Sequence, residues 1–361
     1  MKNDRLLSVD FFRGITMFLL IGEFTHMFTY MTAPQFEGSW LDLIGTQFHH
    51  HPWNGMRFWD LVQPFFMFIV GVAIPLSSVK REARGDSRSS MTVHAFKRAA
   101  ILLVLGWALY CIGPGRITFR FQNVLAQLSV AYLIAFLIRN QRVWIQAAIS
   151  VFLLLITELL YRAFSVPGFD QPFTPDKNFG AWFDLLISGE LSGGHWVSFN
   201  AVPTTAHTIW GVLAGRLLLS QKNVNRKMVL MIVPGILLVM AGVLLDPVTP
   251  IIKRISTSTF VLVSGGWSLI ALALSYWIID VKGYREWSRF FAIVGMNPLF
   301  IYLFAHVGGS DLVFQVFKPF TFFLMGWTDE IFAKMMTSAI TWMFLWYICY
   351  WLYRHRIFIK I

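Results

Sequence analysis

The chain has 361 residues, of which 56% are hydrophobic, 17% aromatic and only 14% charged. A soluble domain carries roughly 25% charged residues, so about half of the usual charge is missing. This composition excludes an ordinary soluble domain and predicts a polytopic membrane protein. The formal net charge of +11 does not predict a nucleic-acid partner, because most of the cationic residues fall on one predicted side of the membrane.

Long apolar runs separated by short polar clusters predict the elements of the fold. A helix needs about 20 residues to cross a bilayer, and the runs predict an all-α transmembrane helix bundle of about ten spans in a single domain, residues 1–361. The segment 310–327 contains Asp311, Lys318 and Pro319, so we interpret it as an interfacial or re-entrant piece, with an eleventh span as the alternative. The predicted spans are 9–31, 58–79, 95–112, 123–138, 143–163, 199–219, 227–246, 257–279, 288–307 and 330–353.

The Lys and Arg residues predict the orientation of these spans. An even number of spans places both termini on the same side, and 21 of the 30 Lys and Arg residues fall in segments on that side. Cytoplasmic loops carry an excess of Lys and Arg, so both termini are predicted to be cytoplasmic. The N-terminal segment runs into the first span without a small-residue cleavage site, so no removable signal peptide is expected.

The two cysteines, Cys111 and Cys349, both lie in apolar settings. Cysteine in such a setting behaves as a small buried hydrophobe. Neither a disulfide framework nor a thiolate metal site is therefore predicted.

Seven motifs follow one another along the chain. They are RLLSVDFFRGITM, HPWNGMRFWDLVQPFFMFIVGVAIPLS, AGRLLLS, IIKRISTSTFVLVSGGW, DVKG, VGMNPLFIY and YRHRIFIKI. Together and in this order they resemble the membrane domain of the heparan-α-glucosaminide N-acetyltransferases, in the compact bacterial form that lacks the large luminal extension. The resemblance runs from about residue 5 to the last residue.

This resemblance implies a transmembrane acyltransferase of the bacterial inner membrane. It implies that acetyl-CoA is supplied from the cytoplasm and that the acetyl group passes to the amine of a terminal glucosamine on the periplasmic side. The acceptor would be an amino sugar or an oligosaccharide derived from heparin or heparan sulfate. A homodimer in the lipid bilayer is also implied.

The outer loop between the first two spans contains three adjacent histidines, His49, His50 and His51. Acetyl transfer needs a neutral amine, and histidine is suited to remove a proton near neutral pH. The resemblance implies that the functional histidine stands three residues before the Trp of Trp-Asn-Gly, which is His50. We expect a general base, or alternatively a transient acetyl acceptor. The three histidines could instead form a solvated loop, and no metal site is predicted because adjacent residues rarely converge on one ion.

Residues that follow the histidines, together with one residue of a later outer loop, complete the predicted outer site. Trp53, Asn54 and Gly55 predict a turn into the second span, and Trp53 could equally be an interfacial anchor. Asp60 lies just inside that span, where a carboxylate is a functional hypothesis by default. It could orient His50, hold a sugar hydroxyl or serve a structural pairing. In the outer loop 164–198, His195 follows two glycines and is a weak candidate for the sugar-facing rim.

The first span departs from the family pattern at its outer end. Many relatives have an asparagine twelve residues after the Phe of Phe-Arg-Gly, where this chain has Phe24, preceded by Glu23. One residue of offset rotates a helix position by about 100°, so Glu23 cannot simply replace the asparagine. We expect Glu23 and His26 to face the cavity and to contact the acceptor.

Coenzyme A is a polyanion, so its binding site needs cations at the cytoplasmic mouth. Arginine binds phosphate with two oxygens at once. The candidates are Arg13, Lys97 and Arg98, and the resemblance adds Lys360. Each could instead be only a topology signal. Polar residues within spans that could line the slot for the pantetheine arm are Ser256, Ser258, His207 and Asn297, although small polar residues in spans often only pack helices together.

Two other functions stay compatible with the sequence. The acceptor group could be a hydroxyl, which would make the protein an O-acyltransferase for envelope glycans. The chain could also be a secondary transporter for sugars or organic anions. Inverted repeats would favour a transporter, and no convincing pairing of the two halves is found.

Overall fold

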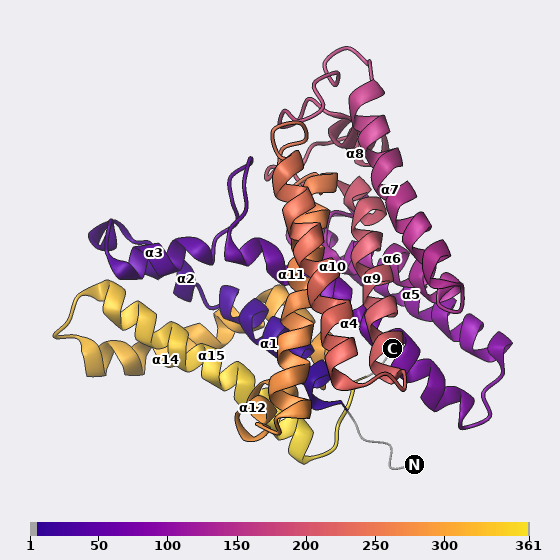
Figure 1. Ribbon diagram of the computed structural model, residues 1–361. Coiled ribbons are helices and arrows are strands. Elements are labelled where there is room, and N and C mark those ends of the chain that lie inside the picture. The colour runs from indigo at the N-terminus through magenta and orange to yellow at the C-terminus, as the bar shows by residue number, and fades with distance from the viewer. Residues whose placement is uncertain (1–5, 360–361) are drawn as a thin grey trace. The chain divides into compact units, whose positions relative to one another are not determined.

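The computed structural model describes residues 6–359, and within them every regular element is a helix (Figure 1). Packing divides the chain into two compact units. Unit 1 contains residues 6–50, 57–62 and 275–359, and unit 2 contains residues 51–56 and 63–274. The all-α prediction is confirmed. The prediction of one domain over the whole chain stays a prediction.

Unit 1 is built around helix α1, which spans Leu7–Glu23. Leu7 and Ser8 begin this helix, and their backbone N–H groups donate to the carboxylate of Asp280. An acidic side chain satisfies the free N–H groups at the positive end of a helix. The other helices of unit 1 are α2 (Met27–Met31), α3 (Trp40–Gln47), α12 (Glu286–Val294), α13 (Pro298–Phe304), α14 (Ser310–Met325) and α15 (Glu330–Arg354).

Small residues let α1 pack tightly against its neighbours. A Cβ atom at Gly14 would overlap the carbonyl oxygen of Phe291 in α12. A Cβ atom at Gly22 would lie 2.5 Å from the indole ring of Trp342 in α15. Close backbone approach of this kind is typical of helix packing in membranes. It fixes the position of α1 along its axis relative to α12 and α15.

Unit 2 is a bundle in which α6 and α7 both pack against α9. At the end of α7, a hydrophobic cluster of Tyr161, Phe179, Val197, Ile252 and Ile255 joins the long loop 164–198 to the segment before α11. The helices of unit 2 are α4 (Val62–Glu82), α5 (Arg88–Ile112), α6 (Val124–Ile138), α7 (Val143–Ala163), α8 (Phe179–Ser188), α9 (Ala201–Leu219), α10 (Val224–Leu245) and α11 (Ser258–Ser275).

Within residues 6–359, seven helical stretches are long and apolar enough to cross a membrane. Six of them match predicted spans, and the seventh is Pro298–Met325. The count of ten spans and the cytoplasmic location of the termini stay predictions. The six matching stretches are Phe58–Glu82, Arg88–Ile112, Val143–Ala163, Val224–Leu245, Ser258–Val281 and Glu330–Arg354.

Two predicted spans are not continuous helices, which corrects the sequence prediction. The predicted span 9–31 breaks after Glu23, and His26 adopts a left-handed conformation with φ 62° before α2 begins. The predicted span 288–307 breaks at Asn297 because α12 ends at Val294 and Pro298 starts α13. The segment 310–327 is also helical and continues from α13 through a kink at Gly308.

Both cysteines of the chain are free, as predicted from their apolar surroundings. Cys349 is buried in α15, and Cys111 is partly exposed near the end of α5.

Replacing Gly14 with leucine is expected to destabilise the protein strongly. The new side chain has to displace the backbone of α12, and overpacking costs about 3 kcal/mol or more where the backbone cannot give way. Thermal unfolding of the detergent-purified variant measures the effect. Gly113→Leu is the matched control, because Gly113 has φ −58° and no atom within 4 Å of the new Cβ position. Equal stability of the two variants would contradict this packing.

Candidate active site

The structure places His50 against Asp60 in unit 1. Asp60 lies in the short 3₁₀ turn Phe58–Leu61 that leads into α4, and it is 0% exposed. Its Oδ1 atom lies 3.0 Å from Nδ1 of His50, whose side chain is 31% exposed. The prediction that Asp60 could orient His50 is therefore supported by a direct contact, with the carboxylate buried and the imidazole partly accessible.

Arg57 closes this network in a way that the sequence analysis did not foresee. Its backbone N–H donates to Oδ2 of Asp60 at 2.9 Å, and its guanidinium donates to the backbone carbonyl of His50 at 3.2 Å. Both oxygens of the buried carboxylate therefore have partners. The sequence signal for this role is an arginine three residues before Asp60 in a tight turn, and Arg57 is not among the predicted site residues.

The contact with Asp60 determines how His50 can exchange a proton. An ionised carboxylate only accepts hydrogen bonds, so Nδ1 of His50 carries the hydrogen. In the neutral ring the lone pair then lies on Nε2. A carboxylate behind the imidazole also stabilises the imidazolium that forms when Nε2 takes up a proton. The His50–Asp60 pair can therefore act as a general base.

The two neighbouring histidines have different surroundings. Nε2 of His49 lies 3.2 Å from the carbonyl of Phe28 and 3.2 Å from the hydroxyl of Thr32, so this ring ties the loop to α2. His51 belongs to unit 2 and lies against Gly55, where a Cβ atom would approach the ring to 2.8 Å. Gly55 has φ 126°, so both its backbone and its lack of a side chain are required here.

The C-terminal end of α1 brings a second carboxylate close to this network. The indole N–H of Trp59, the residue before Asp60, donates to Oε1 of Glu23 at 3.2 Å. Trp59 is 1% exposed and packs in a cluster with Phe28 and Val62, whereas Glu23 is exposed. Glu23 therefore has one oxygen fixed by a rigid neighbour of Asp60.

Phe24 is surrounded by aromatic rings. Its ring centroid lies 5.4 Å from that of His306 and 6.4 Å from that of Tyr302. The phenylalanine that stands at the family's asparagine position is thus a packing residue, and Glu23 is the polar group that faces Trp59.

His26 is paired with a residue that the sequence analysis placed in a different element. Its Nε2 atom lies 3.0 Å from Oδ1 of Asp311 in α14, and both side chains are at least half exposed. The predicted contact of His26 with the acceptor stays a prediction.

In unit 2, the rings of Trp53 and His195 pack against each other. The indole N–H of Trp53 donates to the carbonyl of Phe173 at 2.7 Å, and its ring meets His195 edge-on at 6.0 Å. Nδ1 of His195 lies 2.6 Å from Asp176. Asn54 is exposed. The loop 164–198 therefore joins the Trp-Asn-Gly turn, although its role in sugar binding stays a prediction.

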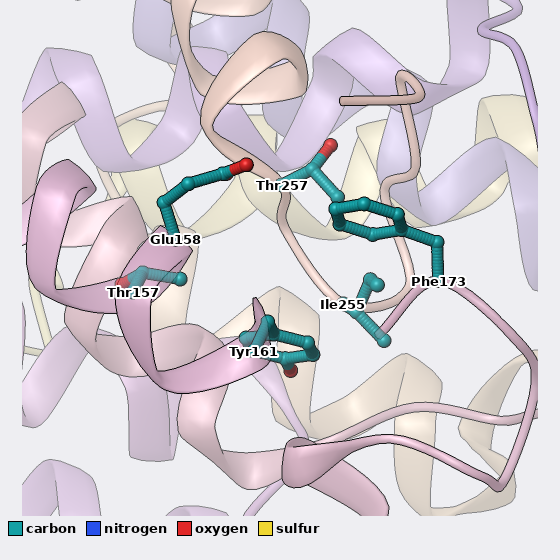
Figure 2. Close-up of a pocket in the computed structure, with 6 residues that line it drawn as sticks. All are labelled: Thr157, Glu158, Tyr161, Phe173, Ile255 and Thr257. Carbon is teal, nitrogen blue, oxygen red and sulfur yellow. The ribbon is translucent and has the colours of Figure 1, made fainter. Parts of the chain in front are cut away.

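Ser258 and Ser256 use their hydroxyl groups within the chain. Ser258 donates to the carbonyl of Leu154 at 3.2 Å and to Glu158 at 3.3 Å, and Ser256 donates to the carbonyl of Lys253 at 3.2 Å. Glu158 lines a small recess, and Figure 2 shows the residues around it. The residues that line the recess are Thr157, Glu158, Tyr161, Phe173, Ile255 and Thr257.

His207, the other polar span residue considered for the slot, is fully buried in α9. Its Nε2 atom lies 2.8 Å from the hydroxyl of Ser264 in α11. This contact joins two helices of unit 2, which supports the helix-packing alternative for His207.

The predicted coenzyme A residues are distributed over both units. Arg13 in unit 1 donates to Asp10 at 2.9 Å and keeps a quarter of its side chain exposed. In unit 2, Lys97 is exposed and Arg98 lies over the ring of Tyr132 at 4.6 Å. Lys360 lies outside the described residues.

Asn297 is completely buried at the break between α12 and α13. Its side-chain amide is bonded to the backbone of the segment after α15, which carries the last residues of the chain.

Comparison of the sequence with known proteins finds two relatives that share one name. No family model matches the chain. It is 25% identical to the human heparan-alpha-glucosaminide N-acetyltransferase over 424 aligned positions, covering 99% of the chain and 60% of the human protein. The mouse protein of the same name is 31% identical over 136 residues, covering 36% of the chain and 18% of that protein. The chain thus spans about three fifths of the length of the human relative it matches.

These two matches support a distant family relationship between this chain and the heparan-alpha-glucosaminide N-acetyltransferases. The human match extends over nearly the whole chain, so both units are included. The resemblance seen in the motifs is confirmed at this level. The chain is a multi-pass membrane protein related to acetyltransferases.

His49→Leu is expected to lower stability while leaving function per folded molecule intact. The substitution removes the contacts to Phe28 and Thr32, and a single lost hydrogen bond costs about 1 kcal/mol. The thermal midpoint of the purified variant should fall by a few degrees. Its rate of acetyl transfer from acetyl-CoA, per folded molecule, should match that of the wild type. A large loss of specific activity with normal stability would show that His49 has a chemical role.

Proposed function

We propose that this protein is an integral-membrane N-acetyltransferase that moves the acetyl group of acetyl-CoA to the amine of a terminal glucosamine. The observation that carries the proposal is the buried Asp60 paired with a partly exposed His50. The distant relationship to named N-acetyltransferases supports the reaction class. A heparin- or heparan-derived acceptor, a periplasmic acceptor side and a homodimer in a bacterial inner membrane are parts of the same proposal.

The reaction needs one base and no external oxidant or reductant. The amine nitrogen attacks the thioester carbonyl, a C–N bond forms, and the C–S bond breaks. His50 takes the proton that the amine loses, and this proton balances the thiolate of coenzyme A that leaves. Transfer is direct in this scheme. It requires no acetyl-imidazole, an intermediate that water would hydrolyse.

Glu23 has the position and the charge to bind the acceptor amine before the reaction. A free amino sugar is an ammonium ion near neutral pH, and a carboxylate attracts it. Glu23 is also the last residue of α1, where the helix dipole adds partial negative charge. The Trp59 indole holds one oxygen of this carboxylate in place. The ammonium held by Glu23 first loses one proton to solvent, and His50 removes the second proton as the neutral amine attacks the thioester.

Three residues of unit 2 carry groups that suit a polyhydroxylated acceptor. Trp53 offers an aromatic face to a sugar ring, and Asn54 and His195 offer polar groups to its hydroxyls. His26 in unit 1 is assigned to the acceptor on the same chemical ground. These assignments are proposals that rest on exposure and chemistry.

Cations suited to the phosphates of coenzyme A lie in segments that the positive-inside pattern places in the cytoplasm. In unit 1, Arg13 is ten residues before Glu23, which corresponds to a rise of about 15 Å along α1. One helix therefore carries a phosphate-binding candidate and the acceptor site at different membrane depths. Lys97 and Arg98 are the candidates of unit 2. Ser256 and Ser258 stay candidates for the slot, although their hydroxyl hydrogens are already donated within the chain.

Substitution of His50 by alanine is expected to lower kcat by 10²- to 10⁴-fold, the usual contribution of a general base. Release of free thiol from acetyl-CoA and formation of N-acetylglucosamine, both measured with purified protein, report the rate. His51→Ala is the matched control from the same loop and should keep the wild-type rate within a few fold. Full activity of the His50 variant would refute the catalytic assignment.

Glu23→Gln is expected to weaken binding of the acceptor more than binding of acetyl-CoA. The amide keeps the contact with Trp59 but loses the negative charge that attracts an ammonium ion. The KM for glucosamine should rise roughly tenfold, corresponding to about 1.4 kcal/mol, while the KM for acetyl-CoA changes little. Steady-state kinetics with each substrate varied separately measure both. An unchanged KM for glucosamine would remove Glu23 from the acceptor site.

A further inference from the structure

We propose that Asn297 is a positioning residue that clamps the segment after α15, residues 355–359, which we call the C-terminal tail. Its Nδ2 group donates to the carbonyl of Ile357 at 2.9 Å, and its Oδ1 atom accepts from the N–H of Ile359 at 2.9 Å. The donor and the acceptor of the amide are thus both bonded to backbone two residues apart. This changes the role predicted for Asn297, from a ligand of coenzyme A to a support for the segment that precedes Lys360.

The break between α12 and α13 makes this clamp rigid. Asn297 is 0% exposed and has a non-helical backbone (φ −127°, ψ 50°). Pro298 at the first position of α13 disfavours a helical conformation for the residue before it. On the other side of the break, a Cβ atom at Gly295 would lie within 3.0 Å of Asp10 and Gly14 in α1. The amide is therefore held against the part of α1 that carries Arg13.

The tail enters the clamp through a defined helix end. Arg356 has a left-handed conformation with φ 55°, its N–H donates to the carbonyl of Tyr353, and the N–H of Ile357 donates to the carbonyl of Leu352. This pair of hydrogen bonds is the Schellman motif, which ends a helix and turns the chain. The turn fixes the direction of the tail, and Asn297 fixes its distance from α1.

The side chains of the tail are only partly buried. Ile357, Phe358 and Ile359 are 41%, 38% and 42% exposed. The tail is also held through its backbone, and two of these hydrogen bonds come from one buried amide. A buried amide that lost these partners would also pay a desolvation cost, so the clamp and the tail stabilise each other.

The clamp bears on the proposed function through Lys360, which follows Ile359 in the sequence. The resemblance implies that Lys360 binds a phosphate of coenzyme A, and the clamp holds the residue before it, Ile359, through a backbone hydrogen bond. Asn297 then acts on acetyl-CoA binding through Lys360, without contact to the reacting atoms. This part of the inference rests on the proposed function, whereas the clamp itself does not.

Hydrogen exchange of the tail tests the clamp without any substrate. Asn297→Ala should raise the exchange rate of tail amides about tenfold relative to wild type. Ile359→Pro removes the N–H donor and should have a similar effect on the remaining tail amides, whereas Ile359→Ala keeps the donor and is the matched control. The proline variant also serves if Asn297→Ala fails to fold. Unchanged exchange in both disruptive variants would overturn the clamp.

Kinetics test the positioning role. Asn297→Ala and Lys360→Ala should each raise the KM for acetyl-CoA roughly tenfold with kcat within about threefold of wild type, and the double variant should be no worse than Lys360→Ala. Additive effects, or an unchanged KM with a loosened tail, would overturn the positioning role. If the wild-type protein transfers no acetyl group at all, the proposed function fails, and the exchange measurement still decides whether the clamp exists.

Discussion

The carboxylate of Asp60 is completely buried, and a buried charge is tolerated only when it is paired and hydrogen-bonded. This constraint organises the part of unit 1 around the start of α4. The 3₁₀ turn Phe58–Leu61 brings the N–H of Arg57 to one oxygen, and the loop before it brings His50 to the other. Removing the imidazole of His50 would take away one of these partners, whereas the N–H of Arg57 belongs to the backbone. The imidazole therefore has a fixed orientation, which a histidine in a solvated loop would lack.

The three adjacent histidines illustrate why position in the chain does not determine function. His49 is tied to α2, His51 lies over Gly55 in unit 2, and His50 is bonded to a buried carboxylate. The division between the two units falls between His50 and His51. Residues that are neighbours in sequence thus take part in different packing environments, and the surroundings of each ring determine what it can do.

Much of the fold could be predicted from apolar length alone, because a helix that crosses a bilayer must be long and continuous in sequence. The breaks were harder to predict. The break at Glu23–His26 has neither glycine nor proline, so hydrophobic pattern gives no signal for it. The break at Asn297 is flanked by Gly295 and Pro298, which both disfavour a continuous helix. The partner of Asn297 lies sixty residues further along, and no local pattern contains that information.

The candidate site could likewise be predicted only in part, because some of its contacts depend on tertiary structure. His50 and Asp60 follow from the family motif and from the rarity of carboxylates in membrane segments, and their contact is seen in the structure. Arg57 and Trp59 contribute through a backbone N–H and an indole N–H. Such roles depend on the turn that places them and leave little trace in residue type. The pairings of His26 with Asp311 and of His195 with Asp176 likewise require the tertiary fold.

In the proposed reaction, an acetyl group crosses the membrane while both substrates stay on their own sides. This can be measured in sealed vesicles that contain the purified protein, with acetyl-labelled coenzyme A on one side and glucosamine on the other. We expect label on the sugar nitrogen, one free thiol for each amide formed, and no passage of the sugar itself. Uptake of unmodified sugar without acetyl-CoA would refute the proposed reaction and would identify a transporter.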